Sequence, residues 1–305
     1  MAYDMIIIGT GCAGLAGAMY AGRLGMKVLA LGEMRGGTIT TTNIVENYPG
    51  FITLTGMELA QKLEDHARAY PSVEIKDEKA TKIERKSGGT FAITTDAGKH
   101  EAKTVIFATG TEWKKLGAKG EKEFANKGVH YCALCDGAFY KKKIVAVIGG
   151  SDSAAKDALV LTEWADKVYM IYRGEKIRPE PVNYDRVLAN KKIEIIYKTN
   201  VAEILGEKKV SGVTLDKPHK GSSKLALDAV FVAVGHLPLS QLAKEAGVEI
   251  DGKGYVKINR NSETNVPGFY AAGDVTDTRF KQAIVGVGEA VEAVYSAYLY
   301  LDGKE

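Results

Sequence analysis

One glycine-rich pattern constrains the fold of this chain more than any other feature. Tyr3–Ile8 reads as a buried strand that runs into Gly9-Thr10-Gly11-Cys12-Ala13-Gly14. A helical stretch follows and ends near Gly25, and a second short strand covers 27–31. A strand, a glycine turn, a helix and a second strand in this order are typical of the βαβ unit that binds dinucleotides.

Each glycine of this turn has its own physical role. Gly9 permits the tight bend, Gly11 lets the backbone approach a pyrophosphate, and Gly14 lets the helix pack on the strand. The pyrophosphate then lies at the helix N-terminus, where unpaired N–H groups and the helix dipole favour an anion. Glu33 lies 19 residues after Gly14, where its carboxylate can accept hydrogen bonds from the ribose hydroxyls of an adenosine. We therefore predict that these four residues hold the adenosine half of a dinucleotide.

The same pattern returns later in the chain, with Gly149 in the place of Gly9. Strand 143–148 runs into Gly149-Gly150-Ser151-Asp152-Ser153-Ala154, followed by a helix to about residue 165 and a strand at 167–172. Ser151 replaces the second glycine, so its Cβ and hydroxyl point to where a pyrophosphate would come close. A serine can donate a hydrogen bond to that group instead. The candidate contacts in this second turn are Gly149, Ser151, Asp152, Ser153 and Ala154.

The length and the remaining strands indicate two domains. A chain of 305 residues is typical of about two. Further strands are predicted at 91–95, 104–108, 229–234 and near 268–274, and a last helix at 282–301. We predict an α/β protein of two doubly wound, Rossmann-like dinucleotide-binding domains, the second inserted into the first. The predicted bounds are 1–113 and 241–305 for the first domain and 114–240 for the second.

The composition excludes several classes of protein. The net charge of +3 gives no reason to expect nucleic acid or a membrane surface as partner. No apolar run approaches the roughly 18 residues that a membrane span needs, and the apolar run at the N-terminus is too short for a signal peptide. Three cysteines cannot form a disulfide framework that stabilises a chain of this size. We therefore expect a cytoplasmic protein.

Two of the cysteines form a C-x-x-C pair just before the second glycine turn. Cys132 and Cys135 can close a small disulfide ring, and Asp136, directly after them, is placed to move a proton as dithiol and disulfide exchange. A zinc site would need two more ligands, and Cys12 lies in the first glycine turn while the histidines are scattered. Two buried inert cysteines are the other alternative, but these would not account for the adjacent Asp136.

Several segments, taken in order, resemble the low-molecular-weight thioredoxin reductase family over nearly the full length of the chain. The matching segments are Gly9–Gly14, Val45–Phe51, Ala108–Gly110, Gly128–Tyr140, Gly149–Leu159, Ala271–Val275 and Lys281–Ala283. The resemblance implies a flavoprotein with FAD on the first glycine turn. The residues that it implies for FAD are Gly9, Gly11, Gly14, Glu33, Asn47, Ala108, Thr109, Gly110, Gly273, Asp274, Lys281, Gln282 and Ala283.

The resemblance also assigns roles around the cysteines. Cys135 is expected to face the flavin, Cys132 to attack the substrate disulfide, and Asp136 to act as acid and base. Members of the family are homodimers that reduce a thioredoxin-like protein, and their inserted domain rotates because the nicotinamide and the dithiol use the same flavin face. Cys12, Thr38 and Lys281 depart from the family pattern without removing the FAD site.

The electron donor is less well defined than the flavin. Arg173 and Arg178 match two of the arginines that clamp the 2′-phosphate of NADPH, but Gly174 replaces a third and Glu175 adds a negative charge beside the site. NADPH, NADH, a deazaflavin and a ferredoxin all stay open as donors, as does the alternative that both arginines are simply solvated surface charges.

We therefore expect a flavin-dependent disulfide reductase that passes electrons from its donor through FAD and Cys132–Cys135 to a thioredoxin-like protein. Two other functions stay open. A thiol oxidase of the same fold would pass electrons from dithiols to oxygen, and a flavin redox sensor would change state without turnover.

Overall fold

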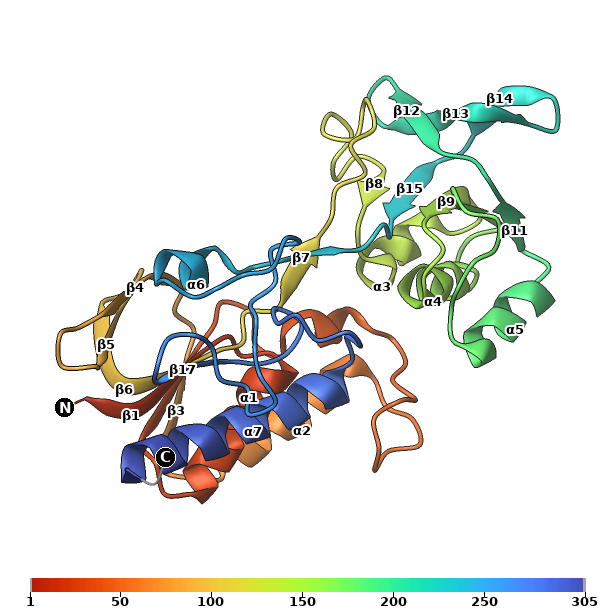
Figure 1. Cartoon of the computed structure of the whole chain (residues 1–305). Coiled ribbons are helices and arrows are strands. Elements are labelled where there is room, and N and C mark those ends of the chain that lie inside the picture. Colours follow the sequence, from red (N-terminus) through yellow and green to blue (C-terminus); the bar gives the residue numbers. More distant parts are fainter. Residues whose placement is uncertain (1, 304–305) are drawn as a thin grey trace. The chain divides into compact units, whose positions relative to one another are not determined.

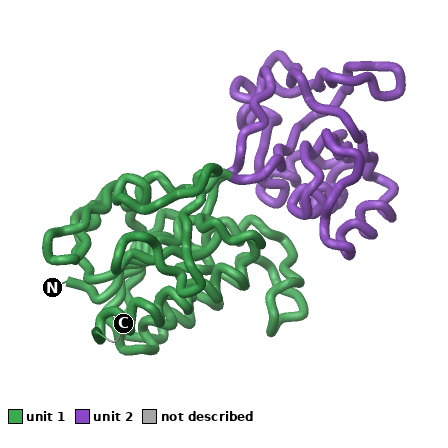
Figure 2. Tube along the Cα trace, in the orientation of Figure 1, with its two compact units in different colours: residues 1–112, 237–305 green, residues 113–236 purple. Residues whose placement is uncertain are grey.

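The computed structural model describes residues 2–303, which form two compact units (Figure 2). Unit 1 consists of residues 1–112 and 237–305, and unit 2 of residues 113–236. The chain passes from one unit to the other along β7 (Thr111–Trp113) and β16 (His236–Pro238), which pair with each other as a two-stranded sheet. The boundaries predicted from the sequence fall after residues 113 and 240.

Unit 1 is built on a seven-stranded sheet with the order β3-β2-β1-β6-β5-β4, in which β17 also pairs with β6 (Figure 1). The strands β1, β2, β3, β6 and β17 run parallel, and β4 and β5 pair antiparallel. Their bounds are β1 Tyr3–Ile8, β2 Val28–Leu31, β3 Val73–Lys76, β4 Ala80–Arg85, β5 Phe91–Thr95, β6 Lys99–Phe107 and β17 Phe269–Ala271.

Two helices on one face of this sheet pack closely because small residues line their contact. The side chains of Leu15 on α1 and Val294 on α7 belong to one buried cluster with Ile7 of β1. At Gly17 of α1, an added Cβ would already lie 3.5 Å from Ile7 and 3.6 Å from Ala290, so the helices meet over a residue without a side chain. The helices of unit 1 are α1 Cys12–Arg23, η1 Gly37–Thr41, α2 Gly56–Arg68, α6 Gln241–Glu245 and α7 Ala283–Asp302.

The helix α7 corrects one expectation from the sequence. Among the described residues it is the one helix that is long and apolar enough to cross a membrane by length and composition, although we expected no such segment. Glu289 and Glu292 interrupt its apolar run in the sequence. The core helix of a soluble protein passes the same test, and Ala290, Ala293 and Val294 are buried against the sheet, so this is weak evidence for a membrane span.

Unit 2 repeats the architecture on a smaller scale. Its parallel sheet has the order β11-β10-β9-β15-β8, and an antiparallel sheet of β12, β13 and β14 covers one end of the core. The strands are β8 Val129–His130, β9 Ile144–Ile148, β10 Lys167–Ile171, β11 Ile193–Ile196, β12 Val201–Gly206, β13 Val210–His219, β14 Ser222–Ala226 and β15 Ala229–Val232. The helices are α3 Ala133–Asp136, η2 Gly137–Tyr140, α4 Asp152–Leu161 and α5 Pro181–Ala189.

The α/β class and the strands of both glycine units are confirmed, whereas some element ends were wrong. β6 begins at Lys99 rather than at residue 104, because its first half pairs with β5 and alternates exposed charged residues with buried ones. The helix α4 ends at Leu161 rather than near residue 165. The three strands β12–β14 were not predicted at all.

Candidate functional site

The first glycine turn leaves an open cradle at the start of α1. Gly9 has φ of 115°, and an added Cβ there would lie 2.1 Å from the carbonyl oxygen of Ala108. A Cβ on Gly14 would lie 1.8 Å from the carbonyl oxygen of Gly9, so neither position accepts a side chain. At Gly11, by contrast, the nearest atom to an added Cβ is 3.8 Å away, and no side chain caps the helix. The first N–H groups of α1 therefore face space that an anion can fill.

The predicted contacts at 108–110 lie against this turn. Ala108 donates its N–H to the carbonyl of Ile8 at 2.8 Å and so continues β6 beside Gly9. The Thr109 hydroxyl donates to the carbonyl of Leu239 at 2.8 Å, and the N–H of Leu239 donates back to Gly110 at 3.1 Å. This segment is therefore fixed where the chain re-enters unit 1.

Glu33 lies beyond the end of β2, and its carboxylate is exposed. It forms an ion pair of 3.0 Å with the ammonium of Lys79, a residue that we did not predict near the site. The two residues are 46 apart in the sequence, so no local pattern could have indicated the contact.

Two predicted flavin contacts from opposite ends of the chain meet in unit 1. The Asn47 side-chain amide donates to the Gln282 side-chain oxygen at 3.0 Å, although 235 residues separate them. Gln282 is the N-cap residue of α7, and Ala283 is the first residue of that helix. The helix N-terminus therefore opens beside Asn47.

The turn that carries Gly273 and Asp274 is held by a residue that the sequence analysis missed. Glu289 of α7 accepts the N–H of Gly273 at 2.8 Å and also the hydroxyls of Thr276 and Thr278. Glu289 is one of only two acids within the apolar stretch of α7 that precedes Asp302, and that contrast is the signal that could have indicated it.

Lys281 completes this end of unit 1. Its ammonium donates to the carbonyl of Thr276 and lies 4.2 Å from the centre of the Tyr255 ring. Burial lowers the pKa of Lys281 below its usual value, although nearby carboxylates, Asp274 first among them, act to raise it. The side chain is therefore positioned by Thr276 and Tyr255 rather than free in solvent.

In the second glycine turn a serine side chain caps the start of the helix, which has no side-chain cap in the first turn. Ser151 is the N-cap of α4, and its hydroxyl oxygen accepts the N–H of Ala154 at 3.4 Å. Asp152 accepts hydrogen bonds from the N–H of Glu180 at 2.9 Å and from the Asn183 amide at 2.8 Å. One of the N–H groups that would meet a pyrophosphate is thus already bonded within the chain.

Asp152 and its neighbour Ser153 face different surroundings. Burial acts to raise the pKa of Asp152, but the hydrogen bonds from Asn183 and Glu180 and the charge of Lys156 hold it below its usual value. The carboxylate is therefore a fixed anion that ties α4 to α5. Ser153 is exposed.

The predicted 2′-phosphate contacts lie on an exposed segment over this turn. The backbone N–H of Arg178 donates to the carbonyl of Gly150 at 2.7 Å, which folds the segment onto the turn. Arg173 and Arg178 are both exposed, and Glu175 forms an ion pair of 2.8 Å with Lys198. A Cβ on Gly174 would lie 2.5 Å from the ring of Tyr172.

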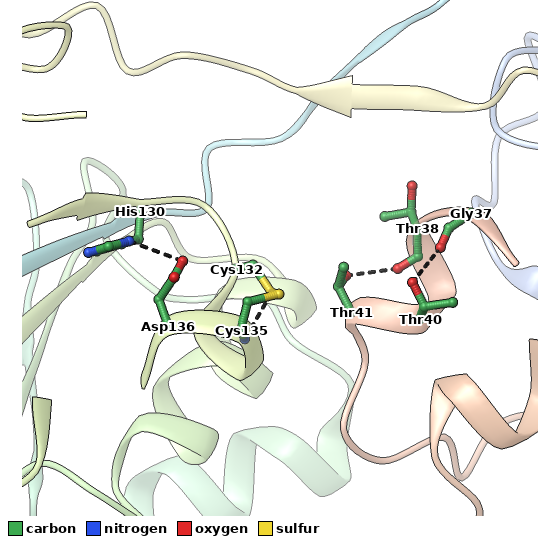
Figure 3. Close-up of a disulfide and its surroundings, with 8 residues drawn as sticks. All are labelled: Gly37, Thr38, Thr40, Thr41, His130, Cys132, Cys135 and Asp136. Carbon is green, nitrogen blue, oxygen red and sulfur yellow. Dashed lines mark hydrogen bonds and ion pairs between the residues drawn. A yellow bond between two sulfur atoms is a disulfide. The ribbon is translucent and has the colours of Figure 1, made fainter. Parts of the chain in front are cut away.

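The two cysteines of unit 2 form a disulfide at the start of α3 (Figure 3). Their Cα atoms are 5.4 Å apart, and the Cys132 sulfur accepts the N–H of Cys135 at 3.1 Å. Cys132 is buried, with 8% of its surface exposed, whereas Cys135 is exposed. The sulfur expected to attack a substrate is therefore the less accessible one while the disulfide is closed.

Asp136 has a partner that the sequence did not predict. Its carboxylate oxygen Oδ2 lies 3.0 Å from Nδ1 of His130 (Figure 3). The other ring nitrogen of His130, Nε2, lies 2.7 Å from the hydroxyl of Tyr140. His130 is buried and stacks on Phe231 with ring centres 5.3 Å apart.

A second carboxyl, that of Asp157, is hydrogen-bonded to the segment that carries the cysteines. Asp157 of α4 accepts a hydrogen bond from the backbone N–H of Ala133, the residue after Cys132. Burial raises the pKa of Asp157 to about 7, and the Ala133 N–H offsets only part of this rise.

The third cysteine is of a different kind. Cys12 is free, and burial raises the pKa of its thiol to about 12, so the thiol stays protonated at neutral pH. Within residues 2–303, no three His, Cys, Asp or Glu side chains are grouped as metal ligands would be.

The sequence and the fold both match known proteins. Residues 3–290 match the family described as pyridine nucleotide-disulphide oxidoreductase. The chain belongs to this family. A thioredoxin reductase of Treponema pallidum is 39% identical over 98% of this chain and 97% of its own length.

Solved structures give the same answer for this oxidoreductase. The thioredoxin reductase of Lactococcus lactis matches it with a TM-score of 0.94 and 35% identity over 99% of both chains. The thioredoxin reductase of T. acidophilum matches with a TM-score of 0.92 and 37% identity, again over 99% of both chains. The predicted fold class and the resemblance are therefore confirmed.

The oxidoreductase is a flavin-dependent disulfide reductase, and its own residues fit FAD. Gly11 leaves a cradle that a Cβ would begin to fill, the start of α1 is uncapped, and Asn47 and Gln282 meet at the start of α7. Bound FAD supplies two-electron exchange, and the protein supplies its position and its electrostatic surroundings.

Proposed function

We propose that this disulfide reductase acts on a thioredoxin-like protein, with FAD in unit 1 and the active disulfide in unit 2. In this assignment unit 1 is the FAD-binding domain, and unit 2 is a NAD(P)-binding-like domain that carries the cysteines. The single observation that carries the proposal is the Cys132–Cys135 disulfide with Asp136 directly after it. The relatives from Treponema pallidum and Lactococcus lactis are both thioredoxin reductases, which supports the choice of partner.

The chemistry follows from the cysteine pair. Two electrons from the flavin and two protons open the disulfide to a dithiol. The Cys132 thiolate then attacks the partner's disulfide to give a mixed disulfide and one partner thiolate, which takes up a proton. Cys135 attacks the mixed disulfide, which restores the ring and releases the partner as a dithiol. Asp136 exchanges a proton with these sulfurs as they alternate between thiol and thiolate.

Alanine at Cys135 tests this mechanism against a matched control. Cys135→Ala should keep the flavin bound and reducible but abolish reduction of thioredoxin, because the mixed disulfide cannot be resolved. Cys12→Ala, which removes the protonated thiol of the first turn, should keep turnover within about twofold. Turnover retained by Cys135→Ala would sink the mechanism.

Trapping identifies the attacking sulfur. With Cys135 replaced, we expect a stable mixed disulfide between Cys132 and the partner, visible as a combined mass under non-reducing conditions. If the adduct forms only with Cys132→Ala, the exposed Cys135 is the attacking residue and the two roles are reversed.

We infer that unit 2 uses NADPH weakly at best, and the donor is therefore part of the proposal. Ser151 occupies the N–H of Ala154, and Gly174 supplies no charge for a 2′-phosphate. One charge-assisted hydrogen bond is worth roughly 1.5–3 kcal/mol, so its loss lowers the preference for NADPH about ten- to a hundredfold.

An anaerobic absorbance titration tests the donor directly. NADPH and NADH are added in separate cuvettes while the flavin band is followed, with dithionite as the positive control. Bleaching by NADPH at micromolar concentration would show that Ser151 and Gly174 are tolerated. Bleaching by dithionite alone would direct the search to a deazaflavin or a ferredoxin.

The assembly and location are proposed on the resemblance. We propose a homodimer in the cytoplasm, where a C-x-x-C pair is kept available for exchange. Light scattering after size exclusion should give twice the chain mass of 32.8 kDa. A mass equal to one chain would refute the dimer.

A further inference from the structure

The carboxyl next to the active disulfide is the end of a chain of three side chains in polar contact. Asp136, His130 and Tyr140, here called the His130 triad, are joined by contacts of 3.0 Å and 2.7 Å. All three lie in the stretch from β8 through α3 to η2, so the disulfide lies within the segment that they span. Neither ring nitrogen of His130 is left for solvent.

The hydroxyl of Tyr140 and the carboxylate of Asp136 together favour one tautomer of His130. Burial, and then the charge of Asp136, raise the pKa of Tyr140, so its hydroxyl stays protonated at neutral pH. Because a carboxylate can only accept, the tautomer of the neutral ring that suits both contacts carries its proton on Nδ1 and accepts the Tyr140 hydroxyl hydrogen at Nε2. Nδ1 lies 3.0 Å from the carboxylate oxygen Oδ2 of Asp136.

We propose that Tyr140 and His130 position Asp136 for proton exchange with the Cys132–Cys135 pair, Tyr140 by holding the ring of His130 through Nε2 and His130 by holding the carboxylate through Nδ1. Because His130 contacts Oδ2, the proposal assigns the proton exchange to the other oxygen, Oδ1. The proposal rests on the proposed function only in taking Asp136 as the acid and base.

The packing around His130 supports a positioning role. Phe231 of β15 stacks on one face of the ring, and Tyr140 packs edge-on against both His130 and Phe231, with ring centres 5.4 Å and 5.8 Å away. The imidazole therefore cannot turn without breaking two aromatic contacts. Asp136 is 31% exposed at its side chain, so water can return the proton that it gives up.

The proton balance of the step is simple. A thiolate from a reductant attacks one sulfur of the disulfide, the S–S bond breaks, and the leaving sulfur becomes a thiolate. Asp136 in its acid form gives that sulfur a proton and becomes a carboxylate, whose Oδ2 lies 3.0 Å from Nδ1 of His130. Solvent then restores the proton to Asp136, and no electron passes through the triad.

The test measures opening of the disulfide by dithiothreitol, which needs neither a nicotinamide nor thioredoxin. The rate is followed by rapid alkylation of free thiols and mass analysis of the flavin-loaded protein. We expect His130→Phe, which keeps an aromatic ring but loses both polar contacts, to slow opening about 10- to 100-fold. Tyr140→Phe, which loses only the hydroxyl, should slow it about 3- to 10-fold.

A double-mutant cycle separates positioning from a general structural role. In the Asp136→Asn background, His130→Phe should change the rate by less than about twofold, because its target is already gone. His219→Asn breaks another histidine–carboxylate contact of unit 2, 2.9 Å to Glu194, and should leave the rate within about twofold.

Two results would overturn the proposal. One is a full His130→Phe effect that persists in the Asp136→Asn background, and the other is an unchanged rate in both His130→Phe and His130→Asn. The proposed function is tested apart from this by offering thioredoxin disulfide to the reduced wild-type protein. If thioredoxin is not reduced while the His130 triad variants behave as expected, the proposed partner is wrong and the role of the triad stands.

Discussion

The two glycine turns have nearly the same backbone but opposite distributions of side chains. Gly11 and Ser151 are both N-cap residues with extended backbones, and each turn is covered by a later segment that donates an N–H to it, from Gly36 to Thr10 and from Arg178 to Gly150. The scaffold of the βαβ unit is therefore independent of what fills its anion site.

The glycine and the residue with a side chain change places between the two copies. In the first copy Thr10 faces Gly32, where an added Cβ would lie 2.3 Å from the threonine hydroxyl. In the second copy Gly150 faces Tyr172, whose ring would lie 2.6 Å from an added Cβ. In each copy a glycine faces a residue with a side chain, Gly32 facing Thr10 and Gly150 facing Tyr172. Tyr172 therefore packs on the turn in the space that Gly150 leaves, and it does not block the turn.

The helices of the two copies also serve different neighbours. Gly17 of α1 meets α7 without a side chain, and Asp157 stands at the equivalent place on α4, where it accepts the N–H of Ala133. The helix α1 therefore packs closely on α7 and has an uncapped N-terminus. The helix α4 instead holds the segment that carries the disulfide.

The largest effect is expected from placing the alanine of the second turn into the first. Gly14→Ala puts a Cβ where the carbonyl oxygen of Gly9 is 1.8 Å away, so the turn must open at a cost of about 3 kcal/mol or more. FAD affinity should fall about a hundredfold or more, measured as flavin retained per chain. Ala154→Gly, the reverse change, should leave the flavin content unchanged; equal flavin loss in both would contradict the comparison.

A change at Asp157 should alter the pH dependence of stability. Its pKa, raised to about 7, exceeds the usual value of 3.8, so the folded state binds more protons and stability falls as the pH rises between these values. Asp157→Asn removes that cost and keeps the acceptor, so at pH 8 it should stabilise by on the order of 2–4 kcal/mol.

The check is the urea midpoint of Asp157→Asn and wild type at pH 5 and pH 8. The gain should be large at pH 8 and small at pH 5, where the carboxyl is already protonated. Asp216→Asn is the control of opposite sign, because hydrogen bonds from Asn200 lower the pKa of Asp216 and the change removes the negative charge that they stabilise. An equal gain for Asp157→Asn at both pH values would refute the linkage.

Exchanging Gly11 and Ser151 separates ligand binding from folding. Gly11→Ser has room, since the nearest atom is 3.8 Å from its Cβ, so the apoprotein should unfold at an unchanged midpoint while FAD binds about tenfold more weakly. Ser151→Gly should lose about 1 kcal/mol of helix capping at most and free the N–H of Ala154. If Gly11→Ser leaves the affinity for FAD unchanged, the cradle is not the pyrophosphate site.

The smallest effect is expected at Glu175. Both members of its ion pair with Lys198 are exposed, at 82% and 61% of their side chains, so their charges are largely screened. Glu175→Ala should change NADPH affinity by less than about threefold, measured by equilibrium dialysis in 0.15 M salt. A tenfold gain would mean that this carboxylate, rather than Ser151 or Gly174, limits the donor site.

The local patterns predicted well, and the contacts across the fold did not. The strands β1 and β5 have the predicted ends because each is a short apolar run between turn residues, and the disulfide follows from a spacing within one turn of chain. The ends of β6 were missed, since its first half is half-exposed.

The residues that hold the site could not be found from the sequence in the same way. Lys79 contacts Glu33, and Glu289 contacts Gly273, only because the fold brings them together, and the sequence does not indicate which residue each of them contacts. His130 lies two residues before Cys132, but only the fold shows that its ring lies between Asp136 and Tyr140.

The central claim is that electrons pass from the flavin through Cys132–Cys135 to a thioredoxin-like disulfide. The most direct measurement reduces the flavin protein with one equivalent of dithionite under anaerobic conditions and adds one equivalent of oxidised thioredoxin. We expect the flavin band to return as two thiols appear on thioredoxin, and we expect neither change with the Cys132→Ala, Cys135→Ala double variant. A flavin that stays reduced in the wild type, or thiols that appear on thioredoxin with the double variant, would contradict it.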